Sequence, residues 1–241
     1  MLKMEFIKSF RNKTLLYIFS SVILSYILGY ILPVGIDKVS KLSIGDFYFS
    51  TYTVFTQFGF LLFGFVIVYF FNKDYADKTI LFSFFSGINS LKFLFTKVTV
   101  LLFEFIFSIF ISNILTALFF GFNSFHFMFS LLMFSLIVLQ YILIVGTISL
   151  IFSNLLISLG VSLVYWILSI ILVAVGGFFK LVAIFDASNS LYVLVEKIFS
   201  KGEIIQMHDF VVVIPYILIL IFLSLFVGVI SNKRWLRNGL L

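Results

Sequence analysis

Residues Val98 to Phe120 read VTVLLFEFIFSIFISNILTALFF, a run of apolar residues that contains a single charge, Glu104. A helix needs about 20 predominantly apolar residues to cross the hydrocarbon core of a bilayer. The strands of a membrane barrel instead alternate apolar and polar residues over about 10 positions. This run is longer than such a strand and does not alternate, so it predicts a membrane-spanning α-helix.

Five further runs of the chain meet the same length rule. They extend over Thr14 to Leu32, Phe47 to Phe71, Phe127 to Phe152, Leu155 to Phe179 and Phe210 to Ile230. The chain of 241 residues is 63% hydrophobic and 11% charged, and so few charges cannot coat a soluble protein. We therefore predict an all-α integral membrane protein with six transmembrane helices, forming a single transmembrane domain over residues 1–241.

The distribution of Lys and Arg predicts the orientation of these spans. Eleven of the 16 basic residues lie in the N-terminal arm, in the stretch after the second span, or in the C-terminal tail. With an even number of spans these three places share one side, which the positive-inside rule assigns to the cytoplasm. We therefore expect a multi-pass protein of the cell membrane with both termini in the cytoplasm. The basic character needs no nucleic-acid partner to explain it.

The stretch Asn72 to Lys97 between the second and third spans carries more pattern than a plain linker. Ile80, Leu81, Phe84 and Phe85 recur at helical spacing, and the acidic residues Asp74 and Asp77 precede them, where they suit the positive end of a helix dipole. We interpret this stretch as a short amphipathic helix at the cytoplasmic interface, a turn at Ser86-Gly87, and a second helix that begins near Asn89 or Ser90 and leads into the third span. The alternative is a solvated loop anchored by its aromatic side chains.

The outer stretch Lys180 to Asp209 mixes apolar residues with charges. It is too apolar to extend freely into water. Short re-entrant helices that dip into the outer leaflet fit this composition if they pack against protein. Amphipathic helices resting on the outer surface fit it equally well.

Catalytic and metal-binding chemistry is poorly represented in this sequence. The chain has no cysteine and no Gly-Lys dipeptide, which excludes thiolate sites and a Walker A phosphate loop. Its histidines, His126 and His208, fall in predicted outer loops, where solvated histidines are expected far more often than metal ligands. We predict no catalytic residue, no metal site and no cofactor within the chain, so the protein is not itself an enzyme.

Three polar residues inside the predicted spans are candidates for a substrate pathway. Glu104 is the acid well inside a span, and such groups usually face a bundle interior or a wet cavity. Its alternative is a structural role near the inner end of its helix. Gln57 and Gln140 are the other two candidates, although amides in membranes more often bond neighbouring helices together.

One face of the fifth predicted span is lined with small and polar residues. Ser158, Ser162, Tyr165 and Ser169 share this face by their spacing. Small residues let a second helix approach closely. We hypothesise a helix–helix interface here, either between two subunits or within the chain.

The order of these features resembles the permease subunits of type-2 ABC exporters. In that family the cytoplasmic stretch often reads Glu-x-x-x-Gly-Thr, followed by a short helix and a lysine. The corresponding residues here are Asp74 and Asp77, Thr79 and Lys97, while Lys78 replaces the family's glycine. The resemblance extends to the topology of the whole chain.

The resemblance implies a half-transporter. Two permease chains, identical or paralogous, would pair in the membrane, and two separate ATPase subunits that bind ATP and Mg²⁺ would dock on the cytoplasmic side. Residues 1–11 would form an interfacial helix, and the outer stretch would form re-entrant helices. The family's coupling helix, which contacts the ATPase, maps onto Lys73, Asp74, Tyr75, Asp77, Lys78, Thr79, Ile80 and Phe84.

The resemblance also implies a substrate class and a mechanism. The small size of the chain is similar to that of members that export amphipathic or hydrophobic peptides, including bacteriocin immunity permeases. ATP binding would drive alternating access through the coupling helix. The competing interpretations are an ATP-independent secondary transporter and an immunity or structural membrane protein that does not transport.

Overall fold

The computed structural model describes residues 2–36, 38–39, 41–202 and 210–231, and these form helices without any strand. Six helices are long and apolar enough to cross a membrane. The spans are α2 (Thr14–Ile31), α4 (Gly59–Ala76), α6 (Ser90–Phe120), α7 (Ser124–Ile151), α8 (Leu155–Val175) and α10 (Val213–Ile230). The predicted fold class with six membrane-spanning helices is thereby confirmed for the described residues. The second span begins at Gly59 rather than Phe47, and the third at Ser90 rather than Val98.

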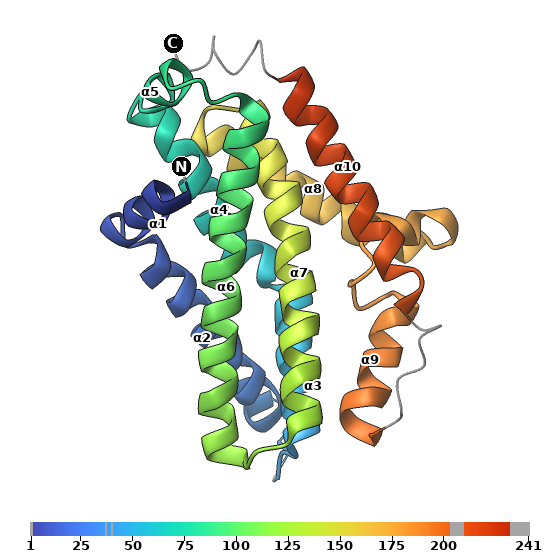
Figure 1. Cartoon of the computed structure of the whole chain (residues 1–241). Coiled ribbons are helices and arrows are strands. Elements are labelled where there is room, and N and C mark those ends of the chain that lie inside the picture. The colour runs from blue at the N-terminus through green and yellow to red at the C-terminus, as the bar shows by residue number, and fades with distance from the viewer. Residues whose placement is uncertain (1, 37, 40, 203–209, 232–241) are drawn as a thin grey trace.

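Shorter helices complete the chain. They are α1 (Leu2–Arg11), the π-helical turn η1 (Leu32–Ile36), α3 (Ile44–Gln57), α5 (Ile80–Phe85), the 3-10 helix η2 (Gly177–Val182) and α9 (Ser190–Lys201). Figure 1 shows α1, α5 and the end of α10 at one end of the bundle, and the turn between α6 and α7 at the other. The predicted sharing of one side by the N-terminal arm and the stretch after the second span is therefore present in the fold.

The second span differs from the prediction because it is broken. α3 ends at Gln57 and α4 begins at Gly59, with Phe58 between them. The hydroxyl of Tyr141 on α7 donates to the carbonyls of Phe55 and Thr56, at 2.9 and 3.1 Å. In an unbroken helix these carbonyls would accept from residues four positions later. A tyrosine from a neighbouring helix thus satisfies backbone groups that hydrocarbon would leave unbonded.

Aromatic rings fill the centre of the bundle. α4 and α7 are the most buried spans, and α7 packs against α3, α4, α6 and α10. The rings of Phe55 and Phe134 stack at 4.6 Å, and those of Phe63 and Phe105 meet edge to face at 5.3 Å. Stacked and edge-to-face pairs are the favourable geometries for aromatic rings.

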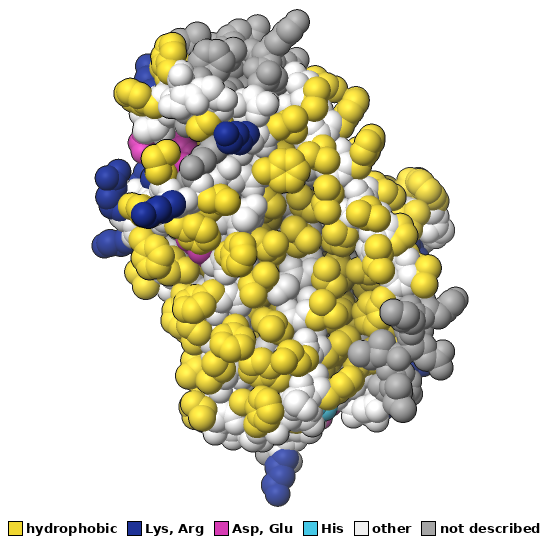
Figure 2. Space-filling view, in the orientation of Figure 1, with side chains coloured by type: hydrophobic (Ala, Val, Ile, Leu, Met, Phe, Trp, Pro, Cys, Tyr) yellow, Lys and Arg dark blue, Asp and Glu magenta, His cyan; other side chains and the backbone are white. Residues whose placement is uncertain are grey.

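Apolar side chains also cover the outside of the bundle. Figure 2 shows a broad apolar surface over the spans, with Lys and Arg gathered mainly at the end that carries α1 and α5. Such a surface is stable only where lipid is the solvent. α1 contributes exposed Leu2, Met4, Ile7 and Phe10 at the charged end of the bundle. A helix is therefore present in the predicted place, and its position at the membrane interface stays a prediction.

The outer stretch folds onto the bundle. α8 ends four residues before its predicted end, because Gly176 and Gly177 take positive φ values of 87° and 61° that terminate the helix. α9 packs against α3, and the hydroxyls of Tyr192 and Thr53 lie 2.6 Å apart. The predicted re-entrant depth of this stretch stays a prediction, and part of it, with His208, lies outside the described residues.

Candidate functional site

Four charged side chains from three helices meet at the end of the bundle near α1. Lys97 Nζ lies 2.9 Å from Glu5 Oε2 and 2.5 Å from Asp74 Oδ2. Lys8 Nζ lies 3.1 Å from Glu5 Oε1 and 3.0 Å from Asp74 Oδ1. Each lysine bridges the same two carboxylates, so the four groups form a closed ring with no net charge. We call these four residues the charge ring.

The charge ring is largely removed from solvent. The side chains of Lys97, Glu5 and Asp74 are only 3%, 5% and 8% exposed, while Lys8 is 29% exposed. Buried charges are costly unless they are paired and bonded. Lys97 also donates to the carbonyl of Phe70 at 3.1 Å and lies 4.0 Å from the centre of that ring. Its three N–H groups thus face two carboxylates and a carbonyl, as an ammonium group requires.

Lys8 is the part of the ring that faces water. Burial alone lowers its pKa, but the negative charges of Asp74 and Glu5 outweigh burial, so the pKa of Lys8 is raised above its ordinary value. The lysine is therefore charged throughout the physiological range. α1 is fixed to α4 by this charge.

The charge ring is connected to the segment before α5 through a hydroxyl. Thr79 Oγ1 donates to Asp74 Oδ1 at 2.7 Å. α4 ends next to Lys78, whose φ of 56° is left-handed and reverses the chain. α5 follows, and α6 then begins with the side chain of Asn89 accepting from the amide of Lys92 at 2.9 Å. The predicted short helix, the turn at Ser86-Gly87 and the helix cap at Asn89 are all present.

The eight predicted coupling residues do not form one surface. Asp77 and Lys78 are exposed, Lys73 and Thr79 are partly buried, and Asp74, Tyr75 and Ile80 are buried. The side chain of Phe84 lies outside the described residues. The exposed apolar residues of α5 are Phe82 and Phe85, at 75% and 81%. Asp74 and Tyr75 are turned into the bundle because α4 continues to Ala76, and Ile80 is buried as the first residue of α5. The ATPase-coupling role of the eight residues stays a prediction.

The three candidate pathway residues lie apart. Glu104 is buried on α6, two turns beyond Lys97, with Ser9 of α1 beside it. Gln140 is buried and accepts from the hydroxyl of Tyr216 at 2.9 Å, so it bonds α7 to α10. Gln57 is partly buried at the end of α3. The fold does not bring them together.

The small and polar face of α8 packs within the chain. Ser158, Ser162 and Ser169 are buried, and the amide of Asn72 on α4 donates to Ser158 Oγ at 2.7 Å. The hydroxyl of Tyr165 donates to the carbonyl of Val182 at 3.2 Å. Of the two alternatives for this face, the structure shows intrachain packing. A contact of this face with a second subunit stays a prediction.

His126 also lies elsewhere than expected. It is part-buried in the first turn of α7, and its Nε2 lies 3.2 Å from the carbonyl oxygen of Phe199 on α9. Its ring stacks with that of Tyr48. Across the part of the chain that the structure describes, no group of three or more His, Cys, Asp or Glu side chains is placed to hold a metal ion.

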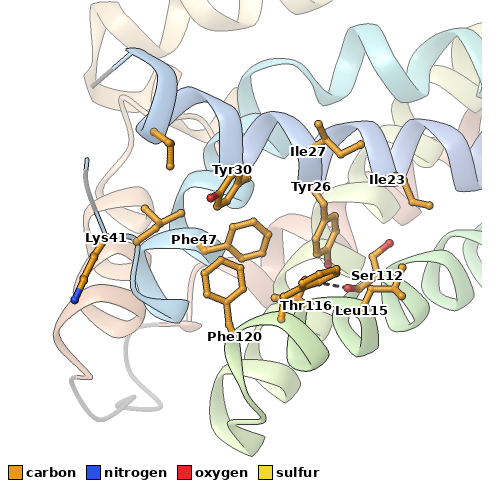
Figure 3. A pocket seen from close by; sticks show the side chains of 13 residues that line it. Ile23, Tyr26, Ile27, Tyr30, Lys41, Phe47, Ser112, Leu115, Thr116 and Phe120 are labelled. Carbon is orange, nitrogen blue, oxygen red and sulfur yellow. Dashed lines mark hydrogen bonds between the residues drawn. The ribbon is translucent and has the colours of Figure 1, made fainter. Parts of the chain in front are cut away.

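A pocket of about 840 Å³ lies between α2, α3 and α6, toward the end of the bundle opposite the charge ring. Figure 3 shows Tyr26 and Tyr30 of α2 facing Phe47 of α3 and Phe120 of α6, with Lys41 at the edge. The rings of Phe47 and Phe120 stack at 5.0 Å. No local sequence pattern predicts this pocket, because its lining comes from separate helices.

The comparisons with known proteins agree with this architecture. A model of the "Peptide export permease protein YydJ family" matches residues 2–240. The chain is 40% identical over 241 residues to the "Probable peptide export permease protein YydJ" of Bacillus subtilis (strain 168). That match includes 99% of this chain and all of the relative. The chain belongs to the YydJ family of peptide export permeases. No solved structure matches it.

The charge ring of this family member was only partly accessible to sequence reasoning. Asp74 and Lys97 stand out by their place in the stretch Asn72 to Lys97. Glu5 and Lys8 were not, since Lys8 and Asp74 are separated by 66 positions. A usable signal existed in the three-residue spacing of Glu5 and Lys8, which places both side chains on the same face of a helix.

Proposed function

We propose that this permease is the transmembrane subunit of an exporter that moves an amphipathic or hydrophobic peptide out of the cell, and that separate ATPase subunits drive it. The observation that carries the proposal is the bond from Thr79 to the charge ring. Through it, the segment that leads into α5 is connected to α1, α4 and α6 at one end of the bundle. A force applied to α5 would therefore reach three helices.

The surface around α5 supports a docking partner at this end. Asp77 and Lys78 present opposite charges to solvent, and Phe82 and Phe85 are exposed beside them. Exposed aromatic residues within a polar rim are typical of protein interfaces. The partner in this proposal is a soluble ATPase that binds ATP and Mg²⁺, since the chain lacks a phosphate-binding loop. The charge distribution supports placing this end in the cytoplasm.

The buried charges support a rigid-body movement of α1, α4 and α6 when a partner acts on α5. A fully paired ring in a low-dielectric setting holds one geometry, because losing any contact leaves a charge uncompensated. ATP binding in the partner would then move α1, α4 and α6 together, as in rigid-body transitions of packed helices. Alternating access in this proposal requires a second permease copy, with the peptide path formed between the two.

Co-purification and transport together test the proposal. The full chain is expressed together with soluble ATPases of its own cell, purified in detergent and reconstituted in vesicles. We expect a stable complex and peptide transport that requires ATP hydrolysis. Transport that is indifferent to ATP would support a secondary transporter, and peptide binding without transport would support an immunity protein. Either result would overturn the proposal.

A pair of matched variants tests the role of Thr79. Thr79→Val removes the hydroxyl that bonds Asp74, and we expect the permease to stimulate the ATPase less while the complex still forms. The control is Thr99→Val, because among the described residues the hydroxyl of Thr99 bonds the carbonyl of Phe95 on its own helix and no other group. Equal stimulation by both variants would contradict the coupling role.

A further inference from the structure

The pocket between α2, α3 and α6 has one apolar end and one polar end. At the apolar end, the polar side chains are already bonded within the chain. The hydroxyl of Tyr26 donates to Asn113 Oδ1 at 2.6 Å, and those of Ser112 and Thr116 donate to backbone carbonyls of their own helix at 2.9 Å. This part of the pocket offers a ligand aromatic and aliphatic contact and almost no hydrogen bonds.

The other end of the pocket carries positive charge. Lys41 lies at the pocket edge, and Figure 3 shows its ammonium group directed away from the aromatic rings. Lys41 and the nearby Lys38 are exposed, and neither makes a salt bridge with another described residue. Tyr30 contributes a half-exposed ring at this end. Aromatic and basic residues at the end of a span mark the headgroup region of a membrane.

The pocket opens between helices whose neighbouring surfaces are apolar. Among its lining residues, Ile27 on α2 and Leu115 and Phe119 on α6 are exposed large apolar side chains. On a membrane span, such residues face hydrocarbon. A molecule in the surrounding leaflet therefore reaches the pocket sideways, without passing through water.

We propose that this pocket binds an anionic phospholipid of the leaflet at the Lys41 end of the bundle. An acyl chain would lie among Tyr26, Phe47 and Phe120, and the phosphate would lie at Lys41. The charge of the headgroup complements the lysine, and the apolar tail matches a lining that offers few hydrogen bonds. The proposal depends on the membrane placement of the chain and is independent of the ATPase partner.

A peptide segment fits the pocket less well than a lipid tail. An extended peptide would bring backbone N–H and C=O groups that find no partners at the apolar end, at a cost of several kcal/mol for each unsatisfied group. A helix is about 10–12 Å wide with its side chains, so a pocket of about 840 Å³ holds no more than about two of its turns. A slender hydrocarbon chain has neither difficulty.

Photo-crosslinking of the full chain in lipid nanodiscs tests the proposal. The probes are phosphatidylglycerol and phosphatidylcholine with a diazirine in one acyl chain, and labelled residues are mapped by mass spectrometry. We expect labelling concentrated on the lining residues of α2 and α6, with the anionic probe favoured roughly fivefold, as one lysine near a headgroup provides. Uniform labelling around all spans would overturn the proposal.

Two variants and one control sharpen this experiment. Leu115→Trp should fill the pocket and abolish the concentrated labelling. Leu118→Trp changes a residue of α6 that is 76% exposed and does not line the pocket, and it should leave the labelling intact. Lys41→Glu should remove the preference for the anionic probe while tail labelling persists. An unchanged preference in Lys41→Glu, or displacement of the lipid by an exported peptide, would contradict the proposed occupant.

Discussion

Replacing Lys97 by methionine tests whether the charge ring holds the bundle together. Methionine retains much of the apolar stem but removes the ammonium group, so Glu5 and Asp74 keep only Lys8 as a counter-ion. Breaking a buried ion pair costs about 3–5 kcal/mol of unfolding free energy, because a buried charge is left uncompensated. Lys97 serves both carboxylates and is 3% exposed. We therefore expect a loss in this range for Lys97→Met.

Two other lysines near this end of the bundle set the scale for that loss. Lys8→Met removes the more exposed partner of the same carboxylates, and we expect a cost of only about 1 kcal/mol, since water screens that side of the ring. Lys92→Met removes an exposed lysine from the first turn of α6 and should be nearly neutral. The assay is equilibrium unfolding in mixed micelles with increasing SDS, followed by far-ultraviolet circular dichroism.

A double variant separates charge pairing from loss of packing. Glu5→Gln combined with Lys97→Met keeps the ring close to neutral. We expect it to lose about 0.5–3 kcal/mol less than the sum of the two single variants, as found for residues in one network. Additive losses, or a Lys97→Met cost no larger than that of Lys8→Met, would refute the view that the ring acts as a buried unit.

Two further predictions concern other contacts. A Cβ at Gly29 would lie 2.3 Å from Thr51 Oγ1 and 2.8 Å from its Cα, so Gly29→Ala should force α2 from α3 and cost about 1–3 kcal/mol. Gly160→Ala, with no atom within 4 Å of its added Cβ, should instead be neutral or stabilise its helix by up to about 1 kcal/mol. The same SDS unfolding assay measures both variants. Equal changes in unfolding free energy for the two variants would contradict the packing argument. Because the folded-state pKa of Lys8 is raised, its stabilising contribution should be fully present below pH 10.5 and lost as pH rises through the folded-state value. The stability difference between the parent and Lys8→Met should shrink over that alkaline range, and a constant difference would count against the ion pairs of Lys8.

The spans were predictable because their signal lies in local composition. Runs of about 20 apolar residues have no other stable placement than across a membrane. The break at Phe58 was not predictable, because it depends on a hydroxyl from Tyr141, more than 80 positions away. The end of the second span was misplaced for a related reason. Asn72, Lys73 and Asp74 look like residues that leave a membrane, but pairing with α1 and α6 lets α4 continue through them.

The candidate site was predictable in part. The local pattern around Asp74 and Thr79 marks the stretch Asn72 to Lys97 as more than a linker, and the helix cap at Asn89 follows from side-chain chemistry. The position at which α4 ends decides which of these residues face the bundle and which face outward. The burial of their side chains could therefore not be predicted from the sequence. The spacing of small and polar residues predicts the packing face of α8. That spacing does not tell whether the helix that packs there belongs to the same chain or to another subunit.

The neutrality of the charge ring means that two lysines serve the chain at two different times. While helices insert, acidic residues contribute little to orientation, so Lys8 and Lys97 count with the other basic residues at their end of the bundle. After folding, the same lysines are bound to Glu5 and Asp74. The lysines that help to orient the chain during insertion thus form ion pairs between helices in the folded bundle, and these pairs leave no unbalanced charge inside it.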